Sequence, residues 1–224
     1  MATPLLVFDL DGTLADTAGD LVAALNHILA REGLNGVALA DARHMVGMGA
    51  RSLISQGFAA NGQTLDAARL EELFVDYLAW YEANIAVHTR LFPGVPEALD
   101  RFEAAGWRFA VCTNKAAHPS VKLLEALGVD ARFAAICGQD TFAWSKPDAR
   151  ALLSTIGRAG GEPGATIMVG DSRTDIATAK NAGVPVVAVD FGYTDVPVSE
   201  LSPDVVISHF DALWDAVARL SPTA

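Results

Sequence analysis

The sequence predicts an α/β fold in which helices cover both faces of a parallel sheet. Short apolar runs alternate with segments of helical length, which is the pattern of strand–helix–strand units. The runs are almost continuously apolar, as expected of strands that are buried on both sides of a sheet. One long interval interrupts the alternation, so we expect a second, helical domain inserted into the first.

Six apolar runs are the predicted strands of the sheet. They cover residues 4–10, 107–113, 133–137, 165–170, 184–190 and 204–208. Helical patterns lie between the later runs, at 115–127, 147–159 and 173–182, and a last one covers 210–220. Strands that are joined through helices in this way pair in parallel.

The interval between the first two runs contains no predicted strand. It holds a helical stretch from Thr17 to Glu32, a glycine-rich piece at 46–54 and a long amphipathic stretch from Leu65 to Ala86. We interpret this interval as a small helical domain. Its limits are expected at 15–18 and 88–94. The second limit includes Phe92-Pro93-Gly94, which predicts a turn.

Composition and charge exclude several classes of function. The chain is 51% hydrophobic, enough for a substantial core, and its net charge of -11 argues against binding nucleic acid or an anionic membrane surface. No apolar stretch approaches the ~20 residues of a membrane span, and the first residues lack the pattern of a signal peptide. Cys112 and Cys137 lie in strand-like runs and are expected to be buried thiols. We therefore expect a cytoplasmic protein, either a monomer or a homodimer.

Polar side chains gather where the predicted strands end. The clusters are Asp9 with Asp11; Thr113, Asn114 and Lys115; Ser145-Lys146-Pro147; and Gly170-Asp171-Ser172 with Asp175. Taken singly, each could be a turn or a helix cap. Their recurrence at successive strand ends favours a ligand site instead, because open α/β sheets bind ligands beyond the carboxyl ends of their strands.

The residue types at these ends indicate phosphoryl chemistry. Asp9 and Asp11 are two like charges on one side of a strand, so a cation is expected beside them. Carboxylate and carbonyl oxygens suit Mg²⁺, and we expect the metal on the side chains of Asp9 and Asp171 and the carbonyl of Asp11, with Asp175 in a supporting position. A carboxylate can also form an aspartyl-phosphate. Thr113, Asn114 and Lys146 would then bind the phosphoryl oxygens.

The four clusters resemble the motifs of the haloacid dehalogenase-like hydrolase superfamily. Asp9-Leu10-Asp11-Gly12-Thr13 is similar to the first motif, Thr113 to the second, Lys146 to the third, and Gly170-Asp171-Ser172 with Asp175 to the fourth. The resemblance implies that Asp9 is the nucleophile and that Asp11, an acid the dehalogenases lack, is the general acid and base. It implies a Rossmann-like core, residues 1–15 and 90–224, with a helical cap domain, residues 16–89, inserted after the first strand.

Within the superfamily the chain is most similar to bacterial phosphoglycolate phosphatases. The similar segments are VFDLDGTLADTAGDL, VGMG, CTNK, GDSRTD and FGY, whereas Gly138-Gln139-Asp140 departs from a pattern with a second Gly before the Asp. The resemblance implies a Mg²⁺-dependent phosphomonoesterase that hydrolyses 2-phosphoglycolate, a small phosphorylated metabolite, through an aspartyl-phosphate. The alternatives are a phosphatase of a sugar phosphate or pyrophosphate, a phosphosugar mutase, and a phospholigand-binding module without catalysis.

Arg51 is the residue of the helical insertion that we expect to bind the carboxylate of such a substrate. The planar guanidinium can donate two hydrogen bonds to a carboxylate. Arg51 follows Gly47 and Gly49, and glycines allow a backbone to approach a ligand closely. The alternative is a solvated arginine on a helix surface.

Overall fold

The structure is a computed structural model that describes residues 2–194 and 196–220. The chain folds into two compact units, one made of Met1–Asp16 with Leu91–Ala224 and the other of Thr17–Arg90. We refer to the first as the sheet unit and to the second as the helical unit. The units therefore divide between residues 16 and 17 and between residues 90 and 91, one residue later than the boundaries expected from the sequence, 15/16 and 89/90.

The sheet unit is built on six parallel strands. They are β1 (Leu5–Phe8), β4 (Arg108–Cys112), β5 (Phe133–Cys137), β6 (Thr166–Gly170), β7 (Val186–Val189) and β8 (Val205–Ile207). Their order is β5-β4-β1-β6-β7-β8, and every neighbouring pair is parallel. Each strand lies within one of the six predicted runs, so the predicted α/β fold is confirmed.

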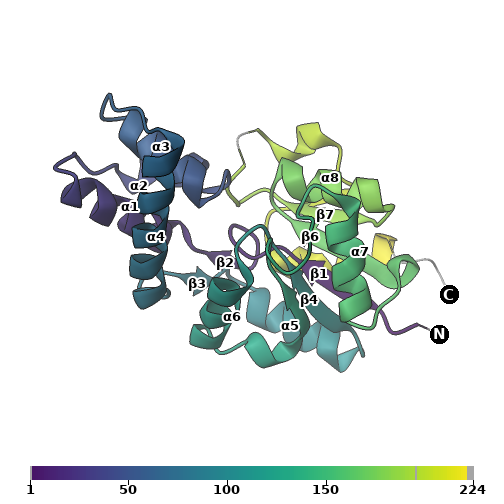
Figure 1. Cartoon of the computed structure of the whole chain (residues 1–224). Helices are drawn as coiled ribbons and strands as arrows, with labels where there is room; N and C mark the ends of the chain where they lie inside the picture. The colour runs from purple at the N-terminus through teal and green to yellow at the C-terminus, as the bar shows by residue number, and fades with distance from the viewer. Residues whose placement is uncertain (1, 195, 221–224) are drawn as a thin grey trace. The chain divides into compact units, whose positions relative to one another are not determined.

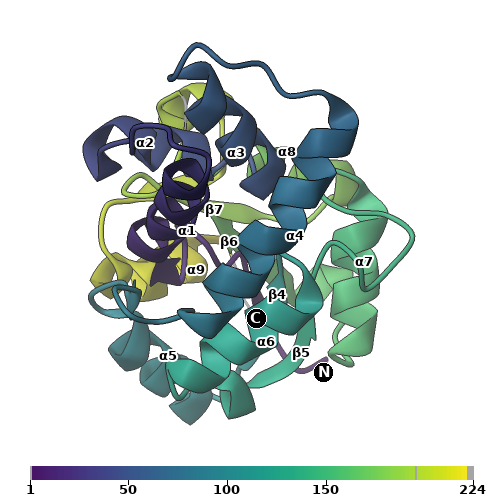
Figure 2. The same cartoon turned by 60° about the vertical axis from the view of Figure 1, so that its left-hand side comes forward.

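Helices cover both faces of this sheet. Successive strand residues point to opposite sides, and in the central strands the side chains on both sides are buried. On one face, Leu5 and Val7 belong to the buried cluster that contains Leu152 of α7 (Ala149–Arg158) and Ile176 of α8 (Arg173–Ala182). The other face is covered by α5 (Val95–Ala104), α6 (Ala117–Ala126) and α9 (Leu213–Leu220), as Figure 2 shows. On that side Phe8 meets Phe109 edge to face, with ring centroids 6.0 Å apart.

The helical unit consists of α1 (Ala18–Arg31), α2 (Leu39–Val46), α3 (Ala50–Ala59) and α4 (Ala67–Ala83), coloured purple to blue in Figure 1. Helices α1 and α4 form its main contact, where the hydroxyl of the buried Tyr77 donates to the carbonyl of Leu21 at 3.2 Å. The buried carboxylate of Asp20 accepts hydrogen bonds from the backbone N–H groups of His88 and Thr89. Asp20 therefore joins the first and last segments of the unit.

Some elements were not expected from the sequence. Helices α2, α3 and α5 were not predicted, and a two-stranded sheet pairs β2 (Ala15–Asp16) with β3 (Arg90–Leu91) in the interval that contained no predicted strand. Strands of two residues show no measurable alternation, and they form only because a partner distant in sequence lies beside them. None of the helices in the described residues has the length and apolar composition that crossing a membrane requires.

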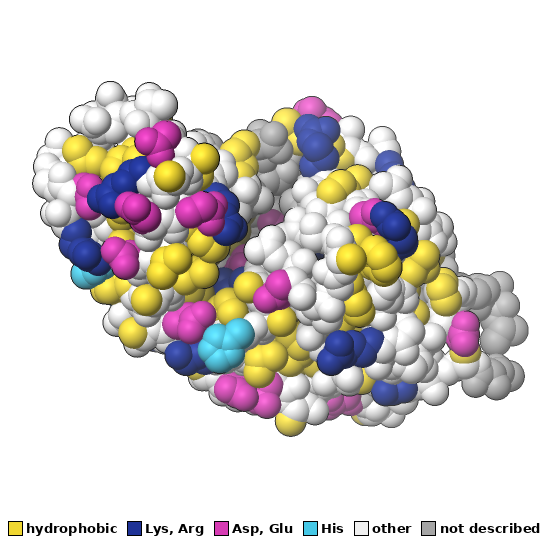
Figure 3. Space-filling model, in the orientation of Figure 1, with side chains coloured by type: hydrophobic (Ala, Val, Ile, Leu, Met, Phe, Trp, Pro, Cys, Tyr) yellow, Lys and Arg dark blue, Asp and Glu magenta, His cyan; other side chains and the backbone are white. Residues whose placement is uncertain are grey.

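Surface charges of opposite sign lie close to one another. On the face shown in Figure 3, Lys and Arg side chains are interspersed with Asp and Glu. Ion pairs join Arg31 to Asp76 at 3.0 Å and Arg69 to Glu72 at 2.8 Å. The face shown therefore lacks the continuous basic area with which proteins neutralise nucleic-acid phosphates.

Candidate active site

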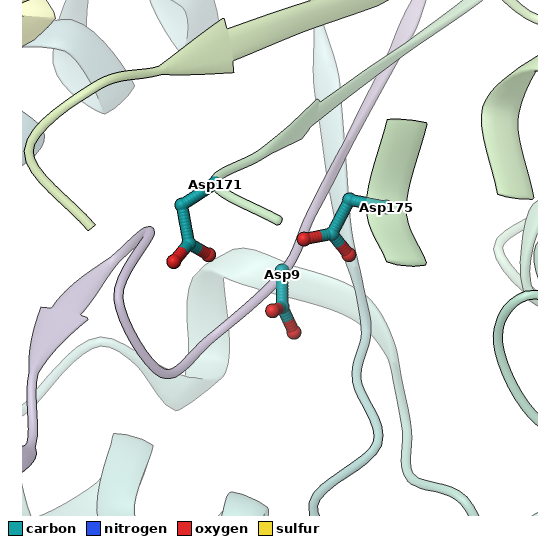
Figure 4. A group of neighbouring side chains, drawn as sticks. All are labelled: Asp9, Asp171 and Asp175. Atoms are coloured by element: carbon teal, nitrogen blue, oxygen red, sulfur yellow. The ribbon is translucent and has the colours of Figure 1, made fainter. Parts of the chain in front are cut away.

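The candidate active site lies at the carboxyl ends of β1 and β6, near the point where the strand order reverses. The N–H of Asp9 continues the ladder of β1 by donating to the carbonyl of Val169 at 2.9 Å. Asp171 directly follows β6, and Asp175 lies in the first turn of α8. One carboxylate oxygen from each of Asp9, Asp171 and Asp175 lies within 4.8 Å of the others, and all three residues are buried (Figure 4).

Lys146, in the loop before α7, joins two of these acids. Its Nζ lies 2.9 Å from Oδ1 of Asp9 and 2.5 Å from Oδ1 of Asp175. The other oxygen of Asp175 accepts from the N–H and hydroxyl of Ser172 in a capping box that begins α8. Both oxygens of Asp175 are thus engaged by the protein, which suits the supporting position expected for it.

The burial of several like charges changes the acidity of the group. Burial raises the pKa of Asp9 to about 6, although Lys146 lowers it. Burial, with the neighbouring Asp175 and Asp9, raises the pKa of Asp171 to about 8. Burial alone would lower the pKa of Lys146, but Asp175 and Asp9 raise it well above its usual range, so this lysine stays charged.

Asp171 is held rigidly by contacts that come from two other segments. The hydroxyl of Thr13 donates to its Oδ1 at 2.8 Å, and the N–H of Tyr193 donates to its Oδ2 at 2.7 Å. Gly12 and Gly192 pack so closely on the carboxylate that a β-carbon at either position would collide with it. Thr13 and Tyr193 were not among the predicted site residues. Both belong to motifs that resemble those of the family, but their contact with Asp171 depends on the fold.

Asp11 pairs with a second lysine. Nζ of Lys115 lies 3.1 Å from Oδ1 and 3.2 Å from Oδ2 of Asp11. Lys115 follows β4, one residue after Asn114, and was grouped with the strand-end cluster without being given a function. Two lysines therefore contact the acids that follow β1, Lys146 at Asp9 and Lys115 at Asp11.

Thr113 and Asn114 directly follow β4. Thr113 is buried, its N–H donates to the carbonyl of Cys137, and its hydroxyl accepts from the N–H of Lys115 at 3.2 Å. The side-chain amide of Asn114 donates to the carbonyl of Lys146 at 3.0 Å. Asn114 therefore links the loop after β4 to the loop that carries Lys146, and its expected contact with phosphoryl oxygens stays a prediction.

Arg51 lies on α3 of the helical unit and is engaged with an acid. Its Nε and one terminal nitrogen donate to the two oxygens of Glu71 at 2.6 and 2.8 Å, and its guanidinium lies 3.7 Å from the centroid of the Phe74 ring. The side chain is 46% exposed. Two of the five N–H donors of Arg51 are thus used by Glu71, and its expected role in binding a substrate carboxylate stays a prediction.

The three clustered carboxylates have the composition of a divalent-cation site. Asp9, Asp171 and Asp175 carry three negative charges against the single ammonium of Lys146, an excess of two when all are ionised. Oxygen donors with excess negative charge suit a hard cation such as Mg²⁺. Burial is the main cause of the raised pKa values of Asp9 and Asp171, and the neighbouring carboxylates raise them further.

The family model for haloacid dehalogenase-like hydrolases matches residues 6–189. The chain belongs to the haloacid dehalogenase-like hydrolase family. The family match spans the whole of the strand-end clusters, from Asp9 to Asp175, and confirms the resemblance inferred from them.

Individual relatives within the haloacid dehalogenase-like family share most of the chain. A protein from Mesorhizobium japonicum named phosphoglycolate phosphatase is 54% identical over 98% of this chain and 96% of its own length. One from Agrobacterium fabrum with the same name is 50% identical over 96% and 92%. The crystal structure of a protein described as a predicted phosphoglycolate phosphatase from Haemophilus somnus superposes with a TM-score of 0.88, at 28% identity over 96% of this chain and 97% of that one.

Proposed function

We propose that this chain is a Mg²⁺-dependent phosphomonoesterase that hydrolyses 2-phosphoglycolate to glycolate and phosphate through an aspartyl-phosphate. The observation that carries the proposal is the buried carboxylate of Asp9, 2.9 Å from the Lys146 ammonium and within 4.8 Å of Asp171. The substrate is inferred from the relatives named phosphoglycolate phosphatase. We expect the enzyme to act in the cytoplasm, with the helical unit serving as its cap domain.

In the first half-reaction, the phosphoryl group moves to Asp9. A carboxylate oxygen of Asp9 bonds to phosphorus, the bond from phosphorus to the glycolate oxygen breaks, and Asp11 gives a proton to that oxygen. In the second half-reaction, Asp11 takes a proton from water, whose oxygen bonds to phosphorus. The bond from phosphorus to the Asp9 oxygen breaks, phosphate leaves, and both carboxyl groups return to their starting states, Asp9 ionised and Asp11 protonated.

The remaining residues stabilise charge and hold geometry. Mg²⁺, held by Asp9, Asp171 and the carbonyl of Asp11 with support from Asp175, would neutralise charge on the phosphoryl oxygens. Lys146 is the charged donor to those oxygens, aided by Thr113 and Asn114. Because Lys146 already contacts Asp9, it can follow the phosphoryl group as that group moves onto this residue.

The proposal is tested by measuring phosphate release from 2-phosphoglycolate, a sugar phosphate, pyrophosphate and an aryl phosphate. We expect the highest kcat/KM for 2-phosphoglycolate, loss of turnover with a chelator, and recovery with Mg²⁺. Asp9→Asn should abolish turnover, whereas Asp215→Asn, an exposed carboxylate on α9, is the matched control. Turnover retained in Asp9→Asn would contradict the covalent mechanism, and a higher kcat/KM for another ester would contradict the substrate.

A further inference from the structure

Lys115 is a largely buried cation that has no role in the proposed hydrolysis. Lys115 contacts both carboxylate oxygens of Asp11, at 3.1 and 3.2 Å, and its side chain is only 8% exposed. Burying an ammonium group is unfavourable unless it interacts with an anion. Phosphoryl binding does not explain Lys115, because Lys146 already supplies the cation beside Asp9.

We propose that Lys115 binds the carboxylate of 2-phosphoglycolate and so selects an anionic leaving group. This inference rests on the proposed function. Asp11 must contact the ester oxygen in order to protonate it, and a single methylene carbon separates that oxygen from the substrate's carboxylate. An ammonium group that contacts Asp11 therefore lies within reach of this carboxylate.

The position of Lys115 also suits recognition better than that of Arg51. Lys115 belongs to the sheet unit, which also holds Asp9 and Asp11, so its distance from the reacting group is set within one compact unit. Arg51 lies in the helical unit, where the two oxygens of Glu71 occupy its guanidinium. A salt bridge as exposed as this one contributes little and competes with water.

The test compares 2-phosphoglycolate with its carboxamide analogue, in which the leaving group is neutral but has nearly the same shape. The quantity measured is the ratio of the two kcat/KM values. Lys115→Gln should lower this ratio roughly ten- to a hundredfold, the effect of losing a hydrogen bond between charged groups. Lys115→Arg, which keeps the charge, should restore most of the ratio, and Lys115→Met serves as a second neutral variant if Gln impairs folding.

Two results would overturn the inference. If Lys115→Gln lowered kcat/KM equally on both substrates, Lys115 would only position Asp11. If the ratio were lowered by Arg51→Gln but not by Lys115→Gln, the substrate carboxylate would be bound by the helical unit. Failure of the proposed function has a different signature. In that case the wild-type enzyme itself would show no preference for 2-phosphoglycolate over its carboxamide, before any substitution is made.

Discussion

Replacing Asp171 by Asn should stabilise the metal-free protein and, at the same time, remove metal binding. Asp171 is buried beside Asp175 and Asp9, which together with burial raise its pKa from 3.8 to about 8. The fold thus favours the protonated form, and ionisation costs stability in the absence of a cation. An asparagine is neutral at every pH, so the variant should lack this cost.

The substitution preserves the contacts that hold the residue. The amide oxygen of the introduced asparagine can accept from the N–H of Tyr193, which now donates to Asp171 Oδ2 at 2.7 Å. Its amide nitrogen can donate to the hydroxyl of Thr13, which can rotate to accept instead of donating. The substitution therefore removes the negative charge of residue 171 and keeps the shape and the hydrogen bonds of its side chain.

The magnitude follows from the linkage between proton binding and folding. A carboxyl whose pKa is higher in the folded than in the unfolded state stabilises the fold most at low pH, where it is protonated in both states. For Asp171 this stabilisation is lost as pH rises from 3.8 towards about 8. Each pH unit within that window changes stability by about 1.4 kcal/mol. We expect Asp171→Asn to be more stable than the wild type by about 1 kcal/mol at pH 4.5 and on the order of 4 kcal/mol at pH 7.

Urea unfolding with a chelator present, at several pH values between 4.5 and 7.5, measures this difference. Asp41→Asn, an exposed aspartate on α2, is the control and should show no such slope. Excess Mg²⁺ should reverse the order, because it stabilises the wild type by mass action and finds no complete site in the variant. Parallel pH profiles for the wild type and Asp171→Asn would refute the reasoning, as would a variant less stable than the wild type at pH 7.

Two further substitutions test how the surroundings of the site contribute to stability. Tyr193→Phe should lower the free energy of unfolding by about 1–2 kcal/mol, because the hydroxyl of Tyr193 donates to Asp16 Oδ1 at 2.6 Å. Urea unfolding with Mg²⁺ present measures this loss, and an unchanged midpoint would show that the hydrogen bond contributes nothing. Arg51→Gln should cost less than about 1 kcal/mol, because its pair with Glu71 is exposed, and a larger loss by the same measurement would identify Arg51 as a structural residue.

The sheet could be predicted from the sequence because each of its strands is an almost uninterrupted apolar run. A buried parallel strand needs apolar side chains on both faces, so the signal is local and requires no knowledge of its partners. Part of the site could be predicted from the same local signal. Asp9, Thr113 and Asp171 each follow directly after a strand, so their gathering at one edge follows from parallel pairing without knowledge of the strand order.

Contacts between distant side chains could not be predicted in this way. Lys115 and Lys146 both follow strands, and no pattern in the sequence indicates which of them pairs with Asp9 and which with Asp11. Tyr193 lies 22 residues beyond Asp171, and only the return of the chain after β7 brings its N–H to that carboxylate. The short helix α3 was not predicted in part because its first residues, 50–54, belong to the piece at 46–54 that was interpreted as glycine-rich.

The balance of charge at the site favours a divalent cation in addition to its two lysines. The four carboxylates of Asp9, Asp11, Asp171 and Asp175 face the ammonium groups of Lys115 and Lys146, which leaves two negative charges when every group is ionised. A divalent cation would balance that excess, and because Asp9 and Asp171 hold protons more tightly than usual, its binding should release protons and strengthen as pH rises. With a metal on Asp9 and Asp171, Lys146 would no longer compensate that part of the cluster alone, while Lys115 would still face the carboxylate of Asp11. Each can then contact one end of a doubly anionic substrate, Lys146 the phosphoryl group and Lys115 the carboxylate, so that occupancy of the metal site would determine how well the enzyme binds its substrate.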